Sequence, residues 1–358
     1  MAKLTESDRK ALVADQFTVG LEKLQETIDA VSDPDADLGG WNKPWASLFA
    51  HGLPFSVGSG KKYNGTNVVS TLFACDKGGA FFSDPRWGTT NQWRQHCGWE
   101  RNPDWHGRKD SFKGIRKWLW KGEGEEPTDF FVPGEERRST LICAWKPLTI
   151  RKDDDPDPSN VRTFQVIRLV GLHSVYNAQQ IACVPTVEAP IEVDPAERYA
   201  KCQRRLDALK LNLREGGDRA YYHTVEDYIR TPKPGQFQSV EAFWSTMWHE
   251  VGHATGHSSR LDREFGKRFG SDAYAFEELV AELCSVIVCA ELGVEGQLQH
   301  HQYVASWMKR ISSDPKALFT AAGKAQEAAT WVLTGGRTSR IEYENGGSED
   351  AEPTSMAA

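Results

Sequence analysis

The sequence "WHEVGHATGH" at residues 248–257 holds three of the ten histidines of the chain, with Glu250 directly after the first. Around it, apolar residues recur three and four positions apart, at positions 240, 243, 244, 247, 248 and 251, which predicts an amphipathic helix. His249 and His253 fall opposite the apolar stripe and one turn apart, so their rings share one side of this helix. The stretch therefore predicts two imidazoles that are presented together.

The pattern H-E-x-x-H on a helix is typical of zinc hydrolases. The imidazoles of His249 and His253 would bind the metal, and Glu250 would act as the general base that takes a proton from the attacking water. We therefore expect a zinc-dependent metallopeptidase, with Mn²⁺ as the alternative to Zn²⁺. A catalytic zinc site also requires a third protein ligand.

A second predicted amphipathic helix, residues 273–292, offers that ligand. Glu278 and Glu282 lie opposite its apolar stripe, whereas Glu277 lies at the boundary of the stripe. We predict that Glu278 is the third ligand and that Glu282, one turn later, hydrogen-bonds a ligand histidine. The two helices are expected to turn their polar faces to a common cleft.

His257 is the alternative third ligand. Its spacing from His253 is shorter than in the metzincin pattern, and Gly256 is expected to end the helix before it. We therefore expect His257 to support a ligand or to cap the helix. Two alternatives for the whole site remain: a solvent-facing helix with chance histidines, and a metal site without catalysis.

Length and composition indicate a soluble protein of two domains, because the chain has 358 residues, 39% of them hydrophobic and 26% charged. Neither a signal peptide nor a membrane span fits its short apolar runs, so we expect no membrane partner and a cytoplasmic location. The seven cysteines are scattered, with no C-x-x-C pair, which indicates reduced thiols.

The order of periodic and turn-rich segments predicts an α+β fold with two domains. Strands are expected at residues 141–150 and 162–177, a hairpin at 219–232, and a domain boundary at "VPTVEAPIEVDP", residues 184–195. The second domain is expected to be mainly helical, with a small sheet. The predicted segments are a helix within 1–38, a mixed α/β domain at 39–185, a zincin-like domain at 186–340, and a disordered acidic tail at 341–358.

The first domain is basic and rich in tryptophan. Residues 41–180 contain 20 Lys and Arg against 15 Asp and Glu, and nine of the 13 tryptophans precede residue 150. Aromatic rings stack on unpaired bases and cations follow the phosphates, which favours binding of single-stranded DNA. The alternative is that these tryptophans belong to the core.

The C-terminal half resembles the metallopeptidase-like domain of ArdC-type antirestriction proteins of plasmids and phages, through the H-E-x-x-H motif, "FGKRFG" (265–270) and "EELVAEL" (277–283). The N-terminal half resembles the single-stranded-DNA-binding domain of this family more loosely. The motifs in that half are "NKPW" (42–45), "KKYNGTNVV" (61–69), "DPRWGTTNQW" (84–93), "WKGEGEEPT" (120–128) and "LHSVYNAQQI" (172–181). Residues between Cys97 and Lys121 look like an insertion.

The resemblance implies a protein that binds single-stranded DNA entering a bacterial cell and counters host restriction. It implies His249, His253 and Glu278 as metal ligands and Glu250 as base. The DNA-contact candidates are Lys43, Trp45, Lys62, Tyr63, Asn64, Trp87, Trp93 and Lys121. Host restriction proteins or other DNA-bound proteins are the candidate substrates.

Three hypotheses follow. The first is a metallopeptidase that DNA binding brings to its protein substrates. The second is a non-proteolytic protein that coats single-stranded DNA and uses the metal only for structure. The third is a metallopeptidase whose N-terminal half binds proteins.

Overall fold

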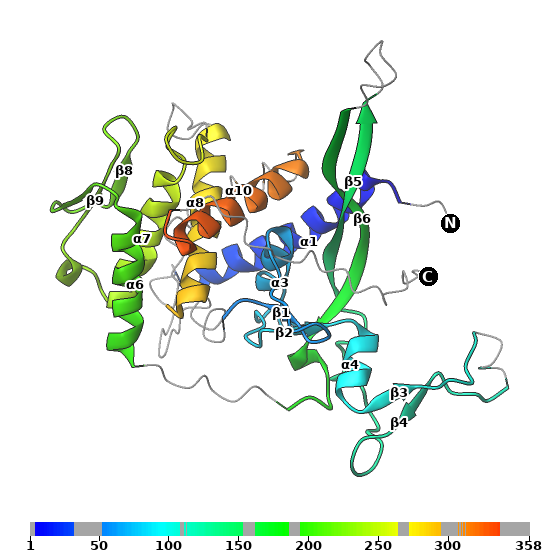
Figure 1. Cartoon of the computed structure of the whole chain (residues 1–358). Helices are drawn as coiled ribbons and strands as arrows, with labels where there is room; N and C mark the ends of the chain where they lie inside the picture. Colours follow the sequence, from blue (N-terminus) through cyan, green and yellow to red (C-terminus); the bar gives the residue numbers. More distant parts are fainter. Residues whose placement is uncertain are drawn as a thin grey trace.

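A computed structural model shows an α+β fold in which the described helices and three sheets pack around a main hydrophobic core (Figure 1). The residues that it describes are 4–31, 52–107, 111, 113–152, 162–185, 194–263, 272–294, 307, 309, 311 and 313–336. The predicted acidic tail and most of the predicted boundary segment lie outside these residues. Among the described residues, no helix is long and apolar enough to cross a membrane.

Helix α1 (Glu6–Val31) confirms the helix predicted near the start of the chain. Thr5 and Asp8 cap it: the Asp8 amide donates to Thr5 Oγ1 and the Thr5 amide donates to Asp8 Oδ2. Gln16 of this helix accepts a hydrogen bond of 2.6 Å from the amide of Leu141, which lies in the largest sheet. The helix therefore packs against that sheet. It is therefore an integral part of the fold.

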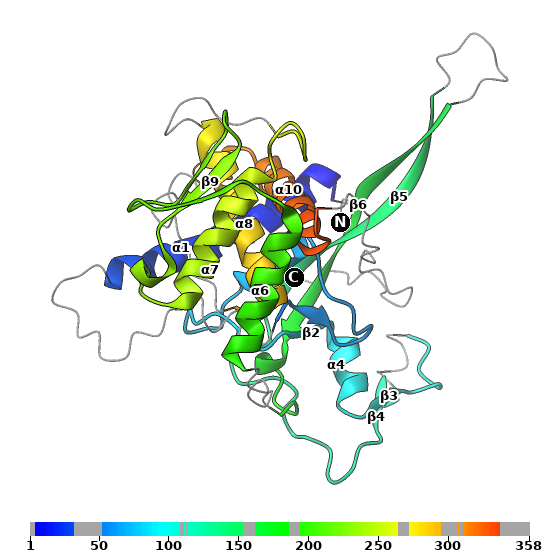
Figure 2. The same ribbon diagram turned by 60° about the vertical axis from the view of Figure 1, so that its left-hand side comes forward.

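The largest sheet has the order β1-β2-β6-β5, formed by β1 (Phe55–Ser56), β2 (Arg86–Gly88), β6 (Arg162–Asn177) and β5 (Thr140–Lys152). Strands β5 and β6 confirm the two long predicted strands. They pair antiparallel along their whole length, with a bulge between Ala144 and Trp145. Their far ends project from the body as a two-stranded ribbon (Figures 1 and 2).

The predicted insertion forms a hairpin at the edge of the molecule. Strands β3 (Trp99–Arg101) and β4 (Trp118–Trp120) pair antiparallel next to α4 (Thr90–His96), while α3 (Thr66–Leu72) lies in the body. Trp99 packs edge-on against Trp120 and Phe130. Part of the tryptophan-rich segment thus builds a small core of its own.

In the second half, the described residues form the helices α6 (Pro195–Leu209), α7 (Val240–Ala254), α8 (Asp272–Leu292) and α10 (Lys316–Leu333). A three-stranded sheet of order β7-β9-β8 lies beside α7, as predicted for a mainly helical part with a small sheet. Its strands are β7 (Leu213–Glu215), β9 (Tyr228–Thr231) and β8 (Tyr221–His223). Short 3₁₀ turns cover Ala178–Gln180 and Pro234–Gln236.

The two halves share a continuous hydrophobic core. It includes Phe17 of α1, Leu169 of β6, Trp248 of α7 and Leu318 of α10, each at most 2% exposed. Lys10 of α1 also lies over the ring of Phe319. The two parts are therefore packed together.

Candidate metal centre

Helices α7 and α8 approach closely at Gly252. Ser239 caps the start of α7 by accepting a hydrogen bond from the Ala242 amide, and the apolar stripe of α7 enters the core. A Cβ atom on Gly252 would lie 3.1 Å from Ala281 Cα. The glycine within H-E-V-G-H thus lets the helices approach, which brings the histidines of α7 to the acids of α8.

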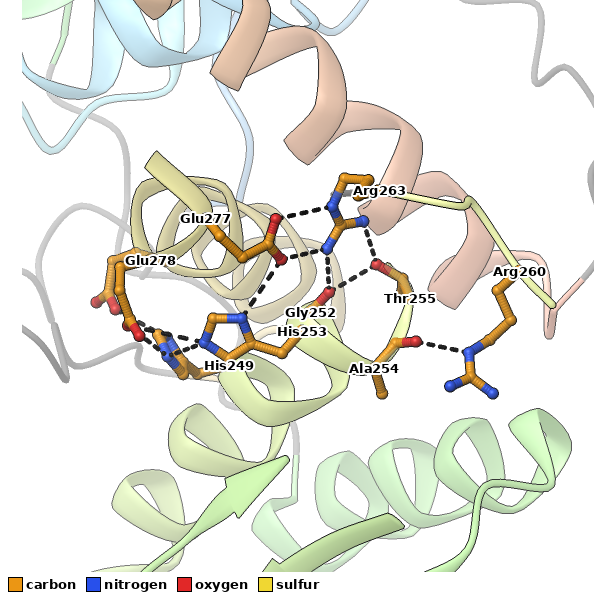
Figure 3. Close-up of polar contacts among 10 residues, drawn as sticks. His249, Gly252, His253, Ala254, Thr255, Arg260, Arg263, Glu277 and Glu278 are labelled. Atoms are coloured by element: carbon orange, nitrogen blue, oxygen red, sulfur yellow. Dashed lines mark hydrogen bonds and ion pairs between the residues drawn. The ribbon is translucent and has the colours of Figure 1, made fainter. Parts of the chain in front are cut away.

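The three predicted ligands come together at this contact (Figure 3). His249 Nε2 lies 3.4 Å from Glu278 Oε2 and 3.1 Å from His253 Nε2, and His253 Nε2 lies 3.7 Å from Glu278 Oε2. A tetrahedral ion with bonds of about 2.0–2.2 Å separates its ligand atoms by about 3.4 Å. The two nitrogens and one oxygen therefore fit a divalent ion such as Zn²⁺.

The other ring nitrogen of each histidine faces a second carboxylate. His249 Nδ1 lies 3.0 Å from Glu282 Oε2, and His253 Nδ1 lies 3.4 Å from Glu277 Oε1. Glu277 is in turn paired with Arg263. Such contacts orient a metal-binding imidazole and select the nitrogen that faces the ion.

The site is more deeply buried than the sequence predicted. His249, Glu278 and Glu282 are 1%, 3% and 2% exposed, because the polar faces of α7 and α8 pack against each other. The two polar faces do turn toward each other, but these three side chains are covered rather than exposed in a cleft. The helical periodicity placed them opposite the apolar stripe but could not show what covers them.

Burial and the surrounding carboxylates shift the ionisation of the two histidines. Burial acts to lower the pKa of His249, but hydrogen bonds with Glu278 and Glu282 outweigh it and raise that pKa to about 10. For His253, contacts with Glu277 and Glu278 likewise outweigh burial and raise the pKa to about 9. An imidazole must be neutral to bind a metal, so an ion displaces these protons.

Glu250 lies beside the three ligands and is 5% exposed. Burial raises the pKa of its carboxyl group, whereas the nearby His249 and His253 act to lower it. The backbone amide of Tyr222, in β8, donates a hydrogen bond to this carboxylate. Strand β8 thus fixes the acid that follows the first histidine.

His257 has a different environment from the other two histidines of the motif. Helix α7 ends at Ala254, close to the predicted end, and the chain turns before His257. His257 Nδ1 lies 2.8 Å from Ser259 Oγ and 3.8 Å from Asp227 Oδ2. Asp227 lies in the β8–β9 turn, so His257 faces that turn.

Two residues of the site, Arg263 and Glu277, are not predicted from the sequence. Glu277 lies at the boundary of the apolar stripe, where a side chain can face either way. Arg263 follows the helix in an irregular segment, where periodicity gives no signal. An arginine shortly after an H-E-x-x-H helix, 14 residues before Glu277, is visible in sequence, but only the fold pairs the two.

Three predicted DNA contacts are corrected by burial. Tyr63, Trp87 and Trp93 are 5%, 1% and 0% exposed, and the Trp93 indole donates to the Tyr176 carbonyl. Their rings are core and are not available to stack on a base, so these three predictions were wrong. Apolar character in the sequence did not distinguish a core ring from an exposed one.

The remaining DNA candidates are on or near the surface, where the structure describes them. Lys62 is exposed and its Nζ lies 2.8 Å from Glu291 Oε2 of α8, Asn64 is half-buried, and Lys121 is exposed. Lys43 and Trp45 lie outside the described residues. The Lys62 ion pair joins the two halves of the chain, so this lysine has a structural partner already.

The fold and the site define a two-part protein with a zincin-like metallopeptidase domain, and family models agree. A model described as a zincin-like metallopeptidase matches residues 200–324, and one described as the N-terminal domain of anti-restriction factor ArdC matches residues 22–175. The uncharacterized protein y4eC of Sinorhizobium fredii (strain NBRC 101917 / NGR234) is 31% identical over 310 residues, which cover 86% of this chain and 89% of that protein. The chain belongs to the ArdC-type antirestriction family.

Solved structures support the same architecture. The antirestriction protein ArdC from plasmid R388 is 24% identical, with a TM-score of 0.53 for its metal-free structure and 0.55 for its Mn(II)-bound structure. The matches cover 89% and 93% of this chain and 97% and 99% of those chains. This likeness shows the fold.

Two DNA primases TraC of Escherichia coli are also similar, with 34% identity over 316 residues and 31% over 318. The match covers 87% of this chain in both cases, but only 26% and 19% of the primases. The chain thus corresponds to a limited part of those longer proteins.

Proposed function

We propose that the chain is an antirestriction protein that binds single-stranded DNA entering a bacterial cell and carries a metallopeptidase centre. The observation that carries this proposal is the close triangle of His249, His253 and Glu278, with Glu250 beside it. It occurs in a chain whose other half matches the ArdC N-terminal model.

His249, His253 and Glu278 would hold the divalent ion through two Nε2 atoms and one carboxylate oxygen. A bound Zn²⁺ would polarise a peptide carbonyl, and Mn²⁺ is the alternative, since an ArdC structure with Mn(II) is known. Glu282 Oε2 lies 3.0 Å from His249 Nδ1, so it would favour the tautomer whose Nε2 lone pair is directed at the ligand triangle.

Glu250 would serve as the general base. Burial raises the pKa of its carboxyl group, which makes the carboxylate a better proton acceptor, and the Tyr222 amide holds it in place. The carboxylate would take a proton from the attacking water and pass it to the leaving amine.

Trp87 and Trp93 are buried, so the proposed surface for DNA lies elsewhere, on the β3–β4 hairpin. Trp105 is half-buried in its loop, with Arg101 Cζ 5.7 Å and Lys117 Nζ 4.9 Å from its ring. A partly exposed ring with two cations beside it would suit a base flanked by phosphates. We therefore add Trp105, Arg101 and Lys117 to the remaining proposed contacts, which are Lys43, Trp45, Lys62, Asn64 and Lys121.

The experiment that tests the proposal is the substitution Glu250→Gln. It removes the base while leaving the three ligands, so it should abolish peptide cleavage and protection from restriction but preserve metal and DNA binding. Protection that survives Glu250→Gln would favour the non-proteolytic coating protein. A wild-type chain that binds no oligonucleotide would favour a peptidase with a protein-binding N-terminal half.

A further inference from the structure

We propose that Arg263 and Glu277 form a positioning pair that sets the orientation of His253 and thereby the metal affinity of the site. This inference rests on the proposed function, since it requires that the site bind a divalent ion. It assigns a role to two buried residues that neither bind the ion nor react.

The first step is the clamp on Glu277. Arg263 Nε donates to Glu277 Oε2 over 3.1 Å and Arg263 Nη2 donates to Oε1 over 2.7 Å (Figure 3). Both oxygens of the carboxylate are thus held by one planar guanidinium, which fixes its rotation. Glu277 and Arg263 are 4% and 7% exposed, so water screens this pair little.

The second step is the attachment of Arg263 to helix α7. Its Nη2 also donates to the Gly252 carbonyl over 2.8 Å, and its Nη1 donates to Thr255 Oγ1 over 2.7 Å. Thr255 Oγ1 in turn donates to the Gly252 carbonyl. The guanidinium therefore rests on the last turn of α7, the turn that carries His253, where a cation is also favoured by the helix dipole.

The third step is the contact with the ligand. Glu277 Oε1 lies 3.4 Å from His253 Nδ1, so a proton on Nδ1 is donated to this oxygen. The lone pair of Nε2 then faces His249 Nε2 and Glu278 Oε2, 3.1 Å and 3.7 Å away. Arg263 acts on the ligand through Glu277, because it fixes where the accepting oxygen lies.

Arg260 provides a matched control in the same segment. Its Nε donates to the Ala254 carbonyl over 2.6 Å, and its guanidinium pairs with both oxygens of Asp227. It therefore makes the same two kinds of contact, with a helix-end carbonyl and with a carboxylate. The carboxylate that it holds, Asp227, however, accepts a hydrogen bond from the Tyr222 hydroxyl and lies in the β8–β9 turn. Asp227 is therefore not the carboxylate that faces a proposed ligand histidine.

The test compares Zn²⁺ affinities, measured against a chromophoric chelator, in full-length variants that retain their circular dichroism. Both Arg263→Met/Glu277→Leu and Arg263→Met/Glu277→Gln remove the buried ion pair, but only the glutamine keeps an oxygen that can accept from His253. The leucine variant should bind Zn²⁺ about 10- to 100-fold more weakly, and the glutamine variant should recover only part of that loss, because its oxygen can accept from His253 but no guanidinium fixes it. Arg260→Met should leave the affinity close to that of the wild type.

Equal Zn²⁺ affinity of the leucine variant and the wild type would overturn the proposal, as would an equal loss in Arg260→Met. If the leucine variant does not fold, Arg263→Lys carries the test, because an ammonium cannot hold both oxygens of Glu277. It should weaken Zn²⁺ binding several-fold, and unchanged affinity would overturn the proposal. A wild-type chain without affinity for either Zn²⁺ or Mn²⁺ would instead refute the proposed metal centre itself.

Discussion

Gly252 lies directly against Ala281, where the two helices that carry the candidate ligands pack together. A Cβ on Gly252 would lie 3.1 Å from both the Cα and the carbonyl oxygen of Ala281, which is tighter than ordinary van der Waals contact. Gly252→Val should therefore force α7 and α8 apart and lower the free energy of unfolding by about 1–3 kcal/mol. Urea unfolding measures the loss.

Gly323 of α10 provides the control for this prediction, because a Cβ there would meet nothing within 4 Å. Gly323→Ala should raise the free energy of unfolding by about 0.5–1 kcal/mol through helix propensity alone. If Gly252→Val proved as stable as the wild type, the close approach would not determine the geometry of the site.

Trp93 and Trp105 should respond oppositely to truncation. Trp93 is fully buried, so Trp93→Ala should cost about 3–5 kcal/mol of stability. Trp105→Ala should have a smaller effect on stability but weaken single-stranded DNA binding by about 1–3 kcal/mol, the contribution of one stacked base. Fluorescence titration with an oligonucleotide and urea unfolding together separate the two effects.

The cations beside Trp105 predict how that binding depends on salt. Replacing Arg101 or Lys117 by Glu should weaken binding of every oligonucleotide sequence and reduce the slope of log affinity against log salt by about 0.7 or more per lost phosphate contact. A slope that stays the same in both variants would exclude the β3–β4 hairpin from the DNA surface.

The Asp227–Arg260 pair predicts a dependence of stability on pH. The hydrogen bond from Arg260 holds the pKa of Asp227 below its ordinary value, so ionised Asp227 stabilises the fold above about pH 4. This contribution is lost as the pH falls through the lower pKa of the folded state. Asp227 has a positive φ of 49°, which asparagine tolerates, so Asp227→Asn tests the charge without adding backbone strain.

Urea unfolding of the wild type and Asp227→Asn at neutral pH and near pH 3 measures this effect. The variant should be less stable at neutral pH, and the difference should shrink at the acidic pH, where the wild-type carboxylate gains its proton. A difference that is equal at both pH values would mean that the charge of Asp227 contributes nothing.

Local periodicity was sufficient to predict the elements that build the site. The three- and four-residue spacing around His249 and Glu278 predicted α7 and α8, and placed both residues opposite the apolar stripes. Strands β5 and β6 were equally visible as long runs rich in β-branched and aromatic residues. Such features depend on neighbours in sequence.

Features that depend on distant contacts could not be predicted. The Arg263–Glu277 pair joins an irregular segment to the boundary of a helix, and the burial of Trp87 and Trp93 depends on packing against other elements. The shared core of the two halves is a further example, because composition suggested a basic and an acidic module but carried no information on their packing. Only the fold supplies these relationships.

The most direct test of the account is a titration of the purified chain with Zn²⁺ and with Mn²⁺, in parallel with His249→Ala, Glu278→Gln and His257→Ala. The wild type should bind one divalent ion per chain, His249→Ala and Glu278→Gln should lose it, and His257→Ala should keep it, because His257 contacts Ser259 and Asp227 instead. A wild type that binds neither ion, or a site that survives loss of His249 and Glu278 but not of His257, would contradict the account.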